Sequence, residues 1–313
     1  MYQLSPIVVF AYNRPRHLEQ TLLALMQNDL ASESNLYIYC DGPKKSATAE
    51  QLTEIVKVRQ VTRQRQWCKQ VHIIESDQNK GLADSIIEGV TEIVNKYGRI
   101  IVLEDDIVTS KGFLKYMNDV LTFYQGNEKV MHVSAYMYPH KGTLPETFFF
   151  NVPYPGGGWA TWQRAWVNFN DDANFLYLYF EEQKQWNKFN KFGGKYLQKQ
   201  LKANVDGELK TWFIKWHATL IMLNGFTLYP CQSLTNNIGF DETATNCSPM
   251  TKFDIEQLAD QISVETIPFA ESNKATRIIV RFYQGRSYLV RSFVIKITPE
   301  WIKPLFKIIL KLK

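Results

Sequence analysis

Residues 99–108 read Arg-Ile-Ile-Val-Leu-Glu-Asp-Asp-Ile-Val, and this stretch decides the fold. Its apolar part, 100–103, is an uninterrupted run with β-branched members, which predicts a strand buried on both faces of a sheet. Glu104, Asp105 and Asp106 follow where that strand leaves the sheet. Adjacent carboxylates repel one another and are costly to desolvate, so the cluster indicates either a solvated acidic turn or a site around a cation.

The chain before this stretch alternates apolar runs with segments of helical periodicity. Strands are predicted at 7–10, 36–40 and 71–75, and helices from Pro15, over 50–66 and from Leu82. Such alternation is typical of an α/β fold, in which a mostly parallel, Rossmann-like sheet is flanked by helices. Ligands of such folds bind beyond the carboxyl ends of the strands.

A polar motif follows each predicted strand. In chain order the motifs are Tyr12-Asn13-Arg14, Asp41-Gly42, Asn79-Lys80-Gly81 and the carboxylates of 104–106. Each of the two middle motifs, taken alone, is an ordinary turn or helix start. The carboxyl ends of parallel strands meet at one edge of a sheet, so we expect the four motifs to converge there.

The order of these motifs resembles the nucleotide-sugar half of glycosyltransferases with the A-type (GT-A) fold. The three-carboxylate form is similar to the N-acetylglucosaminyltransferase I group and to related bacterial sugar transferases of the family 2 type. The resemblance extends over residues 5–247. It implies a GT-A-like catalytic domain at 1–250, with a nucleotide-sugar half at 1–130 and an acceptor half at 131–250, followed by a C-terminal extension at 251–313.

The resemblance also implies roles for the motif residues. Asp106 would ligate Mn²⁺ or Mg²⁺, which stabilises the departing diphosphate, while Glu104 and Asp105 would contact the ribose or the donor sugar. Asp41 would face the nucleoside, and Tyr12 and Arg14 the base or the diphosphate. The remaining expected donor contacts are Asn13, Asn79, Gly81 and, in the later Asn-Ile-Gly-Phe segment, Asn237 and Gly239.

Residues 155–162 read Pro-Gly-Gly-Gly-Trp-Ala-Thr-Trp. Glycines let a ligand sit against the main chain, and Trp faces stack well on sugar rings. Gly157, Gly158, Trp159 and Trp162 are therefore candidates for a donor-sugar and acceptor loop. The alternative is a mobile loop anchored by two core Trp residues.

An inverting transferase needs a carboxylate base that takes the proton from the acceptor hydroxyl. Related enzymes place an acidic residue beside a Trp in the region of Trp212. Here Phe213 follows this Trp and Lys210 lies before it, so the nearest candidates are Asp206 and then Glu208. Both acids fit equally well as the polar start of the helix that runs through Trp212.

The compartment and the partners follow from composition and charge. The four cysteines lack paired spacing, and this favours reduced thiols. The chain shows no signal-like start and no apolar run of the roughly 18–20 residues that span a bilayer, so we expect a cytoplasmic protein. Asn273–Lys313 carry ten Lys and Arg against one acidic residue. The final stretch, 298–313, predicts a basic amphipathic helix that either packs on the protein or binds the inner face of the cytoplasmic membrane.

These features predict a metal-dependent, inverting glycosyltransferase, specific for hexosyl or N-acetylhexosaminyl groups. Its donor would be a nucleotide-diphospho sugar, a uridine-diphospho (UDP) sugar in the first instance. Its acceptor would be a glycan or lipid-linked glycan in bacterial surface polysaccharide synthesis. No nucleic acid is expected as a partner, because the excess of basic over acidic residues is confined to the tail. The alternatives are a retaining transferase, a sugar nucleotidyltransferase, and a degenerate glycan-binding module.

Overall fold

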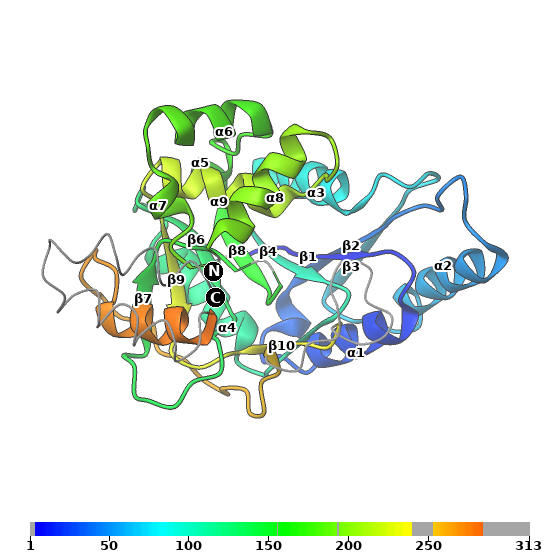
Figure 1. The fold of residues 1–313 in the computed structure, drawn as a ribbon. Coiled ribbons are helices and arrows are strands. Elements are labelled where there is room, and N and C mark those ends of the chain that lie inside the picture. Colours follow the sequence, from blue (N-terminus) through cyan, green and yellow to red (C-terminus); the bar gives the residue numbers. More distant parts are fainter. Residues whose placement is uncertain (1–3, 155, 193, 240–252, 284–313) are drawn as a thin grey trace, which may run out of the picture.

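The structure, a computed structural model, describes residues 4–154, 156–192, 194–239 and 253–283. Its centre is an eight-stranded sheet with the strand order β3-β2-β1-β4-β8-β6-β9-β7 (Figure 1). β8 is antiparallel to both of its neighbours and β7 is antiparallel to β9, while the other pairs are parallel. The predicted α/β fold with a mostly parallel, GT-A-like sheet is confirmed.

The strands of this sheet and the short pair β5/β10 are as follows: β1 (Ile7–Ala11), β2 (Asn35–Cys40), β3 (Gln70–Glu75), β4 (Arg99–Glu104), β5 (Ile107–Thr109), β6 (Val130–Ser134), β7 (Thr147–Phe150), β8 (Trp159–Trp162), β9 (Phe226–Pro230) and β10 (Thr235–Asn237). The α-helices are α1 (Pro15–Met26), α2 (Ala49–Thr62), α3 (Leu82–Tyr97), α4 (Phe113–Phe123), α5 (Gln163–Trp166), α6 (Ala173–Glu182), α7 (Trp186–Phe189), α8 (Lys195–Val205) and α9 (Trp212–Met222). The predicted strands at 7–10, 36–40, 71–75 and 100–103 coincide with β1 to β4, and each end agrees to within one residue.

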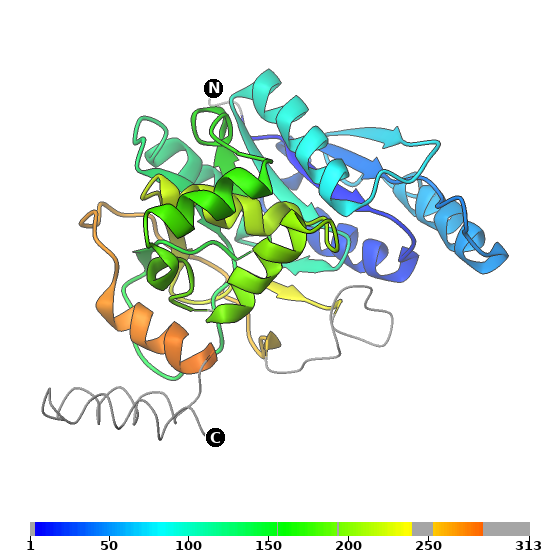
Figure 2. The same ribbon diagram turned by 45° about the horizontal axis from the view of Figure 1, so that its top comes forward.

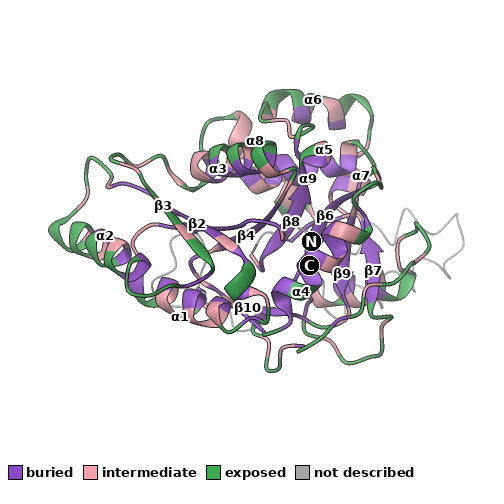
Figure 3. Cartoon of the chain, turned by 180° about the vertical axis from the view of Figure 1, so that it is seen from behind, coloured by how far each residue is buried: buried purple, intermediate pink, exposed green. Residues whose placement is uncertain are grey.

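Helices cover both faces of the sheet, with α1, α2 and α4 on one face and α3, α5 and α9 on the other (Figures 1 and 2). Successive side chains of a strand point to opposite faces. Accordingly, Ile7 and Val9 of β1 belong to the core beneath α1 and α4, while Val8 and Phe10 belong to the core beneath α3 and α9. This arrangement explains why the central strands are apolar without interruption, and Figure 3 shows them buried along their length.

β8 corrects one expectation about the glycine-rich stretch. Trp159 and Trp162 belong to a strand between β4 and β6, and both are buried. Trp159 packs on one face against Trp212, with ring centroids 5.0 Å apart, while the indole Nε1 of Trp162 donates to the carbonyl of Leu121 on the other face. Their rings are covered by the core, so the alternative of two core Trp residues describes them.

Residues 253–283 pack onto the same body. Residues 273–283 are helical, and Ala275 and Ile279 lie in an aromatic cluster with Tyr136 and Phe150. The predicted boundary at residue 250 between a catalytic domain and a C-terminal extension stays a prediction. The basic stretch at 298–313 and Cys247 lie outside the described residues. Among the helices that the structure describes, none is long and apolar enough to cross a membrane.

Candidate functional site

The carboxylate cluster lies at the carboxyl end of β4, between that strand and β5. Asp105 is buried, and Glu104 and Asp106 are half-buried. The Oδ2 atom of Asp106 accepts a hydrogen bond of 2.9 Å from Nη1 of Arg14. The other oxygen, Oδ1, is buried and has no hydrogen-bond partner among the described residues. A buried carboxylate oxygen without a donor is costly, so this atom is placed for a ligand.

Burial and mutual repulsion disfavour negative charge in this cluster. Burial, and then the charges of Asp106 and Asp105, raise the pKa of Glu104 well above its ordinary value. Burial and the charge of Asp106 raise the pKa of Asp105 to about 7. Burial also raises the pKa of Asp106, although the Arg14 guanidinium opposes that shift. A site with these properties stabilises additional positive charge.

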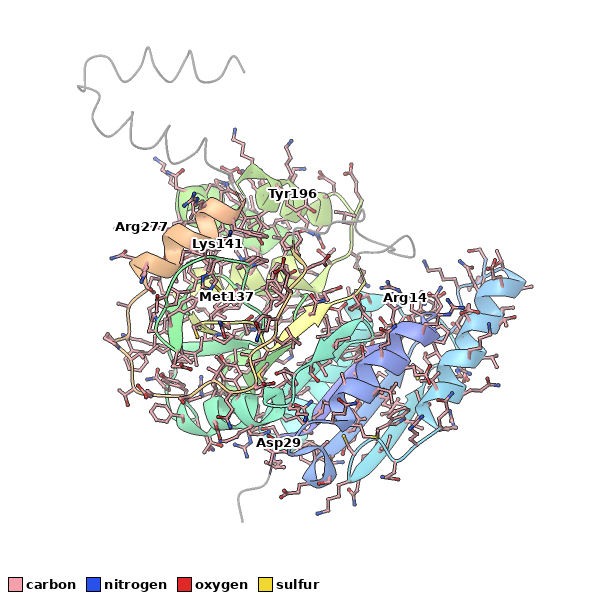
Figure 4. The ribbon with its side chains drawn as sticks, turned by 90° about the horizontal axis from the view of Figure 1, so that it is seen from below. Arg14, Asp29, Met137, Lys141, Tyr196 and Arg277 are labelled. Carbon is pink, nitrogen blue, oxygen red and sulfur yellow. The ribbon has the colours of Figure 1, made fainter. Side chains whose placement is uncertain are left out.

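Arg14 stands at the N-terminal end of α1, next to Pro15 in the first turn. Pro fits there because it has no N–H to leave unpaired and its fixed φ suits a helix start. In Figure 4 Arg14 lies at the end of α1 that meets β10, and Asp29 lies beyond the other end. Besides its bond to Asp106, Arg14 donates from Nη2 to the carbonyl of Gly239 at 3.1 Å, and the same atom lies 3.1 Å from Nε2 of His17.

The segment that contains β10 lies against the carboxylate cluster. β10 pairs with β5, and the N–H of Ile238 donates to the backbone carbonyl of Asp106 at 2.9 Å. The Asn237 side chain accepts from the N–H of Gly239 at 2.7 Å and donates to the carbonyl of Gly156 at 3.0 Å. The structure therefore brings Gly239 to Asp106, with Asn237 hydrogen-bonded to Gly239, and a contact of either residue with a donor stays a prediction.

The glycine-rich loop packs behind this segment. A Cβ on Gly157 would stand 2.2 Å from Cβ of Tyr136, and Gly158 has a φ of +72° and faces Leu103. The Thr235 hydroxyl donates to the Gly157 carbonyl. The glycines thus allow this loop to pack closely against the sheet. The bond from Thr235 to Gly157 joins the loop to β10.

Asp41 ties two of the predicted loops together. Its Oδ1 accepts from the N–H groups of Gly42 and Lys80, both at 2.8 Å. Its Oδ2 accepts from Nδ2 of Asn79 at 2.8 Å and from the N–H of Gly81 at 3.0 Å. Gly81 has a φ of +82°, which favours glycine, and it precedes the first turn of α3. Four donors thus fill both oxygens, so in this structure Asp41 and Asn79 shape the loop that opens α3.

The first loop contributes Tyr12 and Asn13. The N–H of Tyr12 donates to Oδ2 of Asp105 at 3.4 Å, and the Tyr12 hydroxyl is buried without a partner among the described residues. Asn13 is half-buried next to it. The Thr21 hydroxyl donates to the backbone carbonyl of Asp105 at 2.9 Å. Sequence reasoning missed Thr21 and His17, although both lie within two turns of Arg14 on the helix that this loop begins.

The two candidate bases lie elsewhere, after the last turn of α8. Asp206 and Glu208 are exposed, and Lys202 donates to the Asp206 carboxylate. Their neighbours Val205, Gly207 and Leu209 line a cavity of about 420 Å³ together with Asp171 and Asp172, whereas Asp206 and Glu208 are not among its lining residues. Lys215, which is buried, also lines the cavity and pairs with Asp171. Neither Asp171 nor Lys215 is marked by a sequence motif, so only the fold brings them to notice.

An ion pair connects this cavity with the sheet edge. Nζ of Lys210, which also lines the cavity, lies 2.5 Å from Oδ2 of Asp84 in the first turn of α3. The helix α3 begins directly after Gly81, whose N–H is hydrogen-bonded to Asp41. The segment with Asp206 and Glu208 therefore lies next to the loop that Asp41 organises. Within the described residues, no hydrogen bond joins Asp206 or Glu208 to the carboxylate cluster.

The donor set at Asp106 fits a divalent cation that takes most of its ligands from a substrate. No group of three or more His, Cys, Asp or Glu side chains within the described parts of the chain could hold a metal ion by itself. Mg²⁺ and similar ions are often bound through one or two carboxylates together with phosphate oxygens and water. The unpartnered Oδ1 of Asp106 meets that requirement.

Comparison with known proteins agrees with this arrangement. Residues 7–142, somewhat less than half of the chain, match the family model of glycosyl transferase family 2. A comparison with curated proteins gives no match. The description of this family names no subgroup, so the resemblance to the N-acetylglucosaminyltransferase I group stays a prediction.

Three solved structures show a distant likeness. One is a mannosyltransferase, PcManGT, from Pyrobaculum calidifontis in complex with GDP-Man and Mn²⁺ (14% identity, 44% of this chain and 37% of that chain, TM-score 0.33). Another is S. aureus TarS (15%, 46% and 23%, 0.30), and the third is a cytidylyltransferase from Leptospira borgpetersenii (11%, 54% and 64%, 0.33). The alignments span less than two thirds of each of these chains.

Proposed function

We propose that this protein is a metal-dependent glycosyltransferase that transfers a sugar from a nucleotide-diphospho sugar, a UDP-sugar in the first instance, to a glycan or lipid-linked glycan. The observation that supports this proposal is the meeting of Asp106, Arg14 and Gly239 at the carboxyl edge of the parallel strands. The family 2 match over residues 7–142 supports the same class of reaction.

Bond cleavage at the donor leaves negative charge on the departing diphosphate, and that charge must be stabilised. Asp106 would hold Mn²⁺ or Mg²⁺ through Oδ1, and the bound ion would stabilise the diphosphate charge. Arg14, which already lies beside Asp106, would contact a diphosphate oxygen. Tyr12, Asn13 and Asp105 would line the nucleoside side, since the first loop contacts Asp105 through its backbone.

The acceptor would approach from the cavity beside the α8–α9 segment. Asp206 or, as second choice, Glu208 would take the proton from the attacking hydroxyl in an inverting reaction. The ion pair of Lys210 with Asp84 is compatible with this proposal, because it shows that the segment lies next to the first turn of α3. A glycan acceptor carried on a lipid would agree with a membrane-associated tail at 298–313, which we also propose.

The donor site is tested by thermal unfolding with UDP, GDP and CDP and their sugars, each with Mn²⁺ or with EDTA. Wild type is compared with Asp106→Asn and with Asp77→Asn, whose exposed carboxylate serves as the control. We expect one nucleotide to raise Tm only with Mn²⁺, and we expect Asp106→Asn alone to abolish the rise. Stabilisation that ignores the metal and Asp106 would contradict the donor site.

The reaction class is tested by product analysis. A glycosyltransferase releases a nucleoside diphosphate from a sugar nucleotide, and an acceptor increases that release. Pyrophosphate released from a nucleoside triphosphate and a sugar 1-phosphate would instead identify a nucleotidyltransferase. Binding of nucleotide or glycan without turnover would favour the binding module.

A further inference from the structure

Arg14 joins three segments that are distant in sequence. Its guanidinium donates to Oδ2 of Asp106 at 2.9 Å and to the carbonyl of Gly239 at 3.1 Å, and it lies 3.1 Å from the imidazole of His17. The side chains of the ion pair are only 13% and 15% exposed. Such a pair is screened less than a surface pair, so its charges interact more strongly.

Space around the pair is restricted. A Cβ on Gly239 would lie 1.9 Å from Oδ2 of Asp106 and 2.9 Å from Nη1 of Arg14. The backbone of Ile238 is hydrogen-bonded to the carbonyl of Asp106 at 2.9 Å. While Arg14 is bound to Oδ2, the carboxylate can offer only Oδ1 to a new ligand.

The charge of Arg14 weakens the attraction of this position for a cation that arrives alone. Glu104, Asp105 and Asp106 favour additional positive charge, but the guanidinium of Arg14 already lies against Asp106 and would repel a divalent ion. A diphosphate group carries charges and oxygen atoms that suit both Arg14 and a divalent ion. The same nucleotide could thus attract Arg14 away from Asp106 and complete the coordination of the metal.

We infer that Arg14, by holding Oδ2 of Asp106, weakens the binding of a divalent cation at Oδ1 until a nucleoside diphosphate draws the guanidinium away, so that cation and nucleotide bind as a coupled pair. This inference rests on the proposed function of the same site. Binding linkage is reciprocal: if the nucleotide tightens cation binding by some factor, the cation tightens nucleotide binding by that factor. Arg14 is then a positioning residue that determines the size of this factor.

The test measures Mn²⁺ binding from the electron paramagnetic resonance signal of free Mn²⁺, which requires no turnover. Wild type and Arg14→Gln are each titrated alone and with saturating UDP or GDP, and a titration without protein corrects for Mn²⁺ held by free nucleotide. The control is Arg16→Gln, which removes the same charge from an exposed position two residues further along α1. Arg14→Lys keeps the charge but cannot span both Asp106 and Gly239, and it replaces Arg14→Gln if circular dichroism shows that variant to be unfolded.

For wild type and Arg16→Gln we expect nucleotide to tighten Mn²⁺ binding at least tenfold. For Arg14→Gln we expect Mn²⁺ alone to bind at least tenfold more tightly than to wild type, with a nucleotide effect below threefold. For Arg14→Lys both quantities should lie between those of wild type and Arg14→Gln. Unchanged affinity of Arg14→Gln for Mn²⁺ alone would overturn the role of Arg14 while leaving the donor site intact. Absence of Mn²⁺ binding by every protein, with and without nucleotide, would overturn the metal-dependent function and the inference together.

Discussion

Gly239 lies directly against the carboxylate of Asp106, at a position where a Cβ atom would stand 1.9 Å from Oδ2. These two residues belong to segments that are far apart in sequence and meet only because β10 pairs with β5. The close approach leaves no room for a side chain without displacement of Asp106, Arg14 or the β10 segment. The site therefore requires glycine at 239 for a reason that involves the carboxylate cluster itself.

From this contact we predict that Gly239→Ala weakens nucleotide and Mn²⁺ binding at least tenfold. Overpacking at a single position costs about 1–3 kcal/mol, so the fold should persist. Isothermal titration with UDP and Mn²⁺ measures the affinity, and urea unfolding measures the stability. Gly126→Ala is the matched control, because a Cβ there meets nothing within 4 Å. Wild-type affinity in Gly239→Ala would show that the contact is not part of the site.

Asp41→Ala should destabilise the protein by about 2–4 kcal/mol, because it removes charge-assisted hydrogen bonds from the N–H groups of Lys80 and Gly81 and leaves the buried N–H of Gly42 without a partner. Hydrogen exchange should show the first turn of α3 opening more readily than its last turn. Asp77→Ala, in the same loop but exposed, should change the stability by less than about 0.5 kcal/mol. If Asp41→Ala lost nucleotide affinity and kept full stability, its carboxylate would serve the ligand and not the loop.

The two candidate bases can be separated by kinetics. Replacement of the true base should reduce transfer to the acceptor by about 10²–10⁴-fold and leave nucleotide affinity within a factor of about two. We expect this result for Asp206→Asn and a smaller effect for Glu208→Gln. A second variant, Lys202→Met, removes the ion-pair partner of Asp206 and should not abolish transfer. Full activity in both acid variants would direct attention to Asp171, across the cavity.

Stability should fall below neutral pH because two histidines are buried. Burial lowers the pKa of His132 to about 3 and that of His217 to about 4. The unfolded chain binds these protons near pH 6.5 and the folded protein does not, so the stabilisation that exists above pH 6.5 is lost as the pH falls toward 4. Between pH 7 and pH 5 each histidine should cost about 2 kcal/mol.

Urea unfolding of wild type and His217→Gln over this range checks that expectation. Gln can still donate to the carbonyl of Phe189, which lies 3.2 Å from Nε2 of His217. The variant should therefore lose about 2 kcal/mol less than wild type between pH 7 and pH 5. Parallel curves for the two proteins would mean that His217 does not titrate on unfolding in this range.

Local patterns predicted the first half of the molecule well. The apolar run at 100–103 is uninterrupted because β4 is buried on both faces, and the i, i+4 spacing from Pro15 onward reflects a helix with one buried side. The motifs after β1 and β4 converge because parallel strands end at one edge, so Arg14 meets Asp106 without any sequence signal for their pairing. The roles of these residues toward a donor stay predictions.

The second half of the molecule was less predictable because its patterns have two physical meanings. Trp159 and Trp162 suit a sugar platform or a core equally well, and only the insertion of β8 between β4 and β6 buries them. Asp171 and Lys215 are unremarkable in sequence and become neighbours only through the packing of α9 beside the loop before α6.

By itself the sequence determined the order of strands and helices as far as β4, the apolar central strand and the polar residues that end each of these strands, because those features depend on neighbours along the chain. Only the tertiary structure decided that Arg14 pairs with Asp106, that Gly239 must lack a side chain, and that Asp41 saturates its oxygens on the loop before α3. These relationships depend on distances between segments that are remote in sequence. Such distances are fixed by strand pairing and by packing across the sheet, which no local pattern encodes.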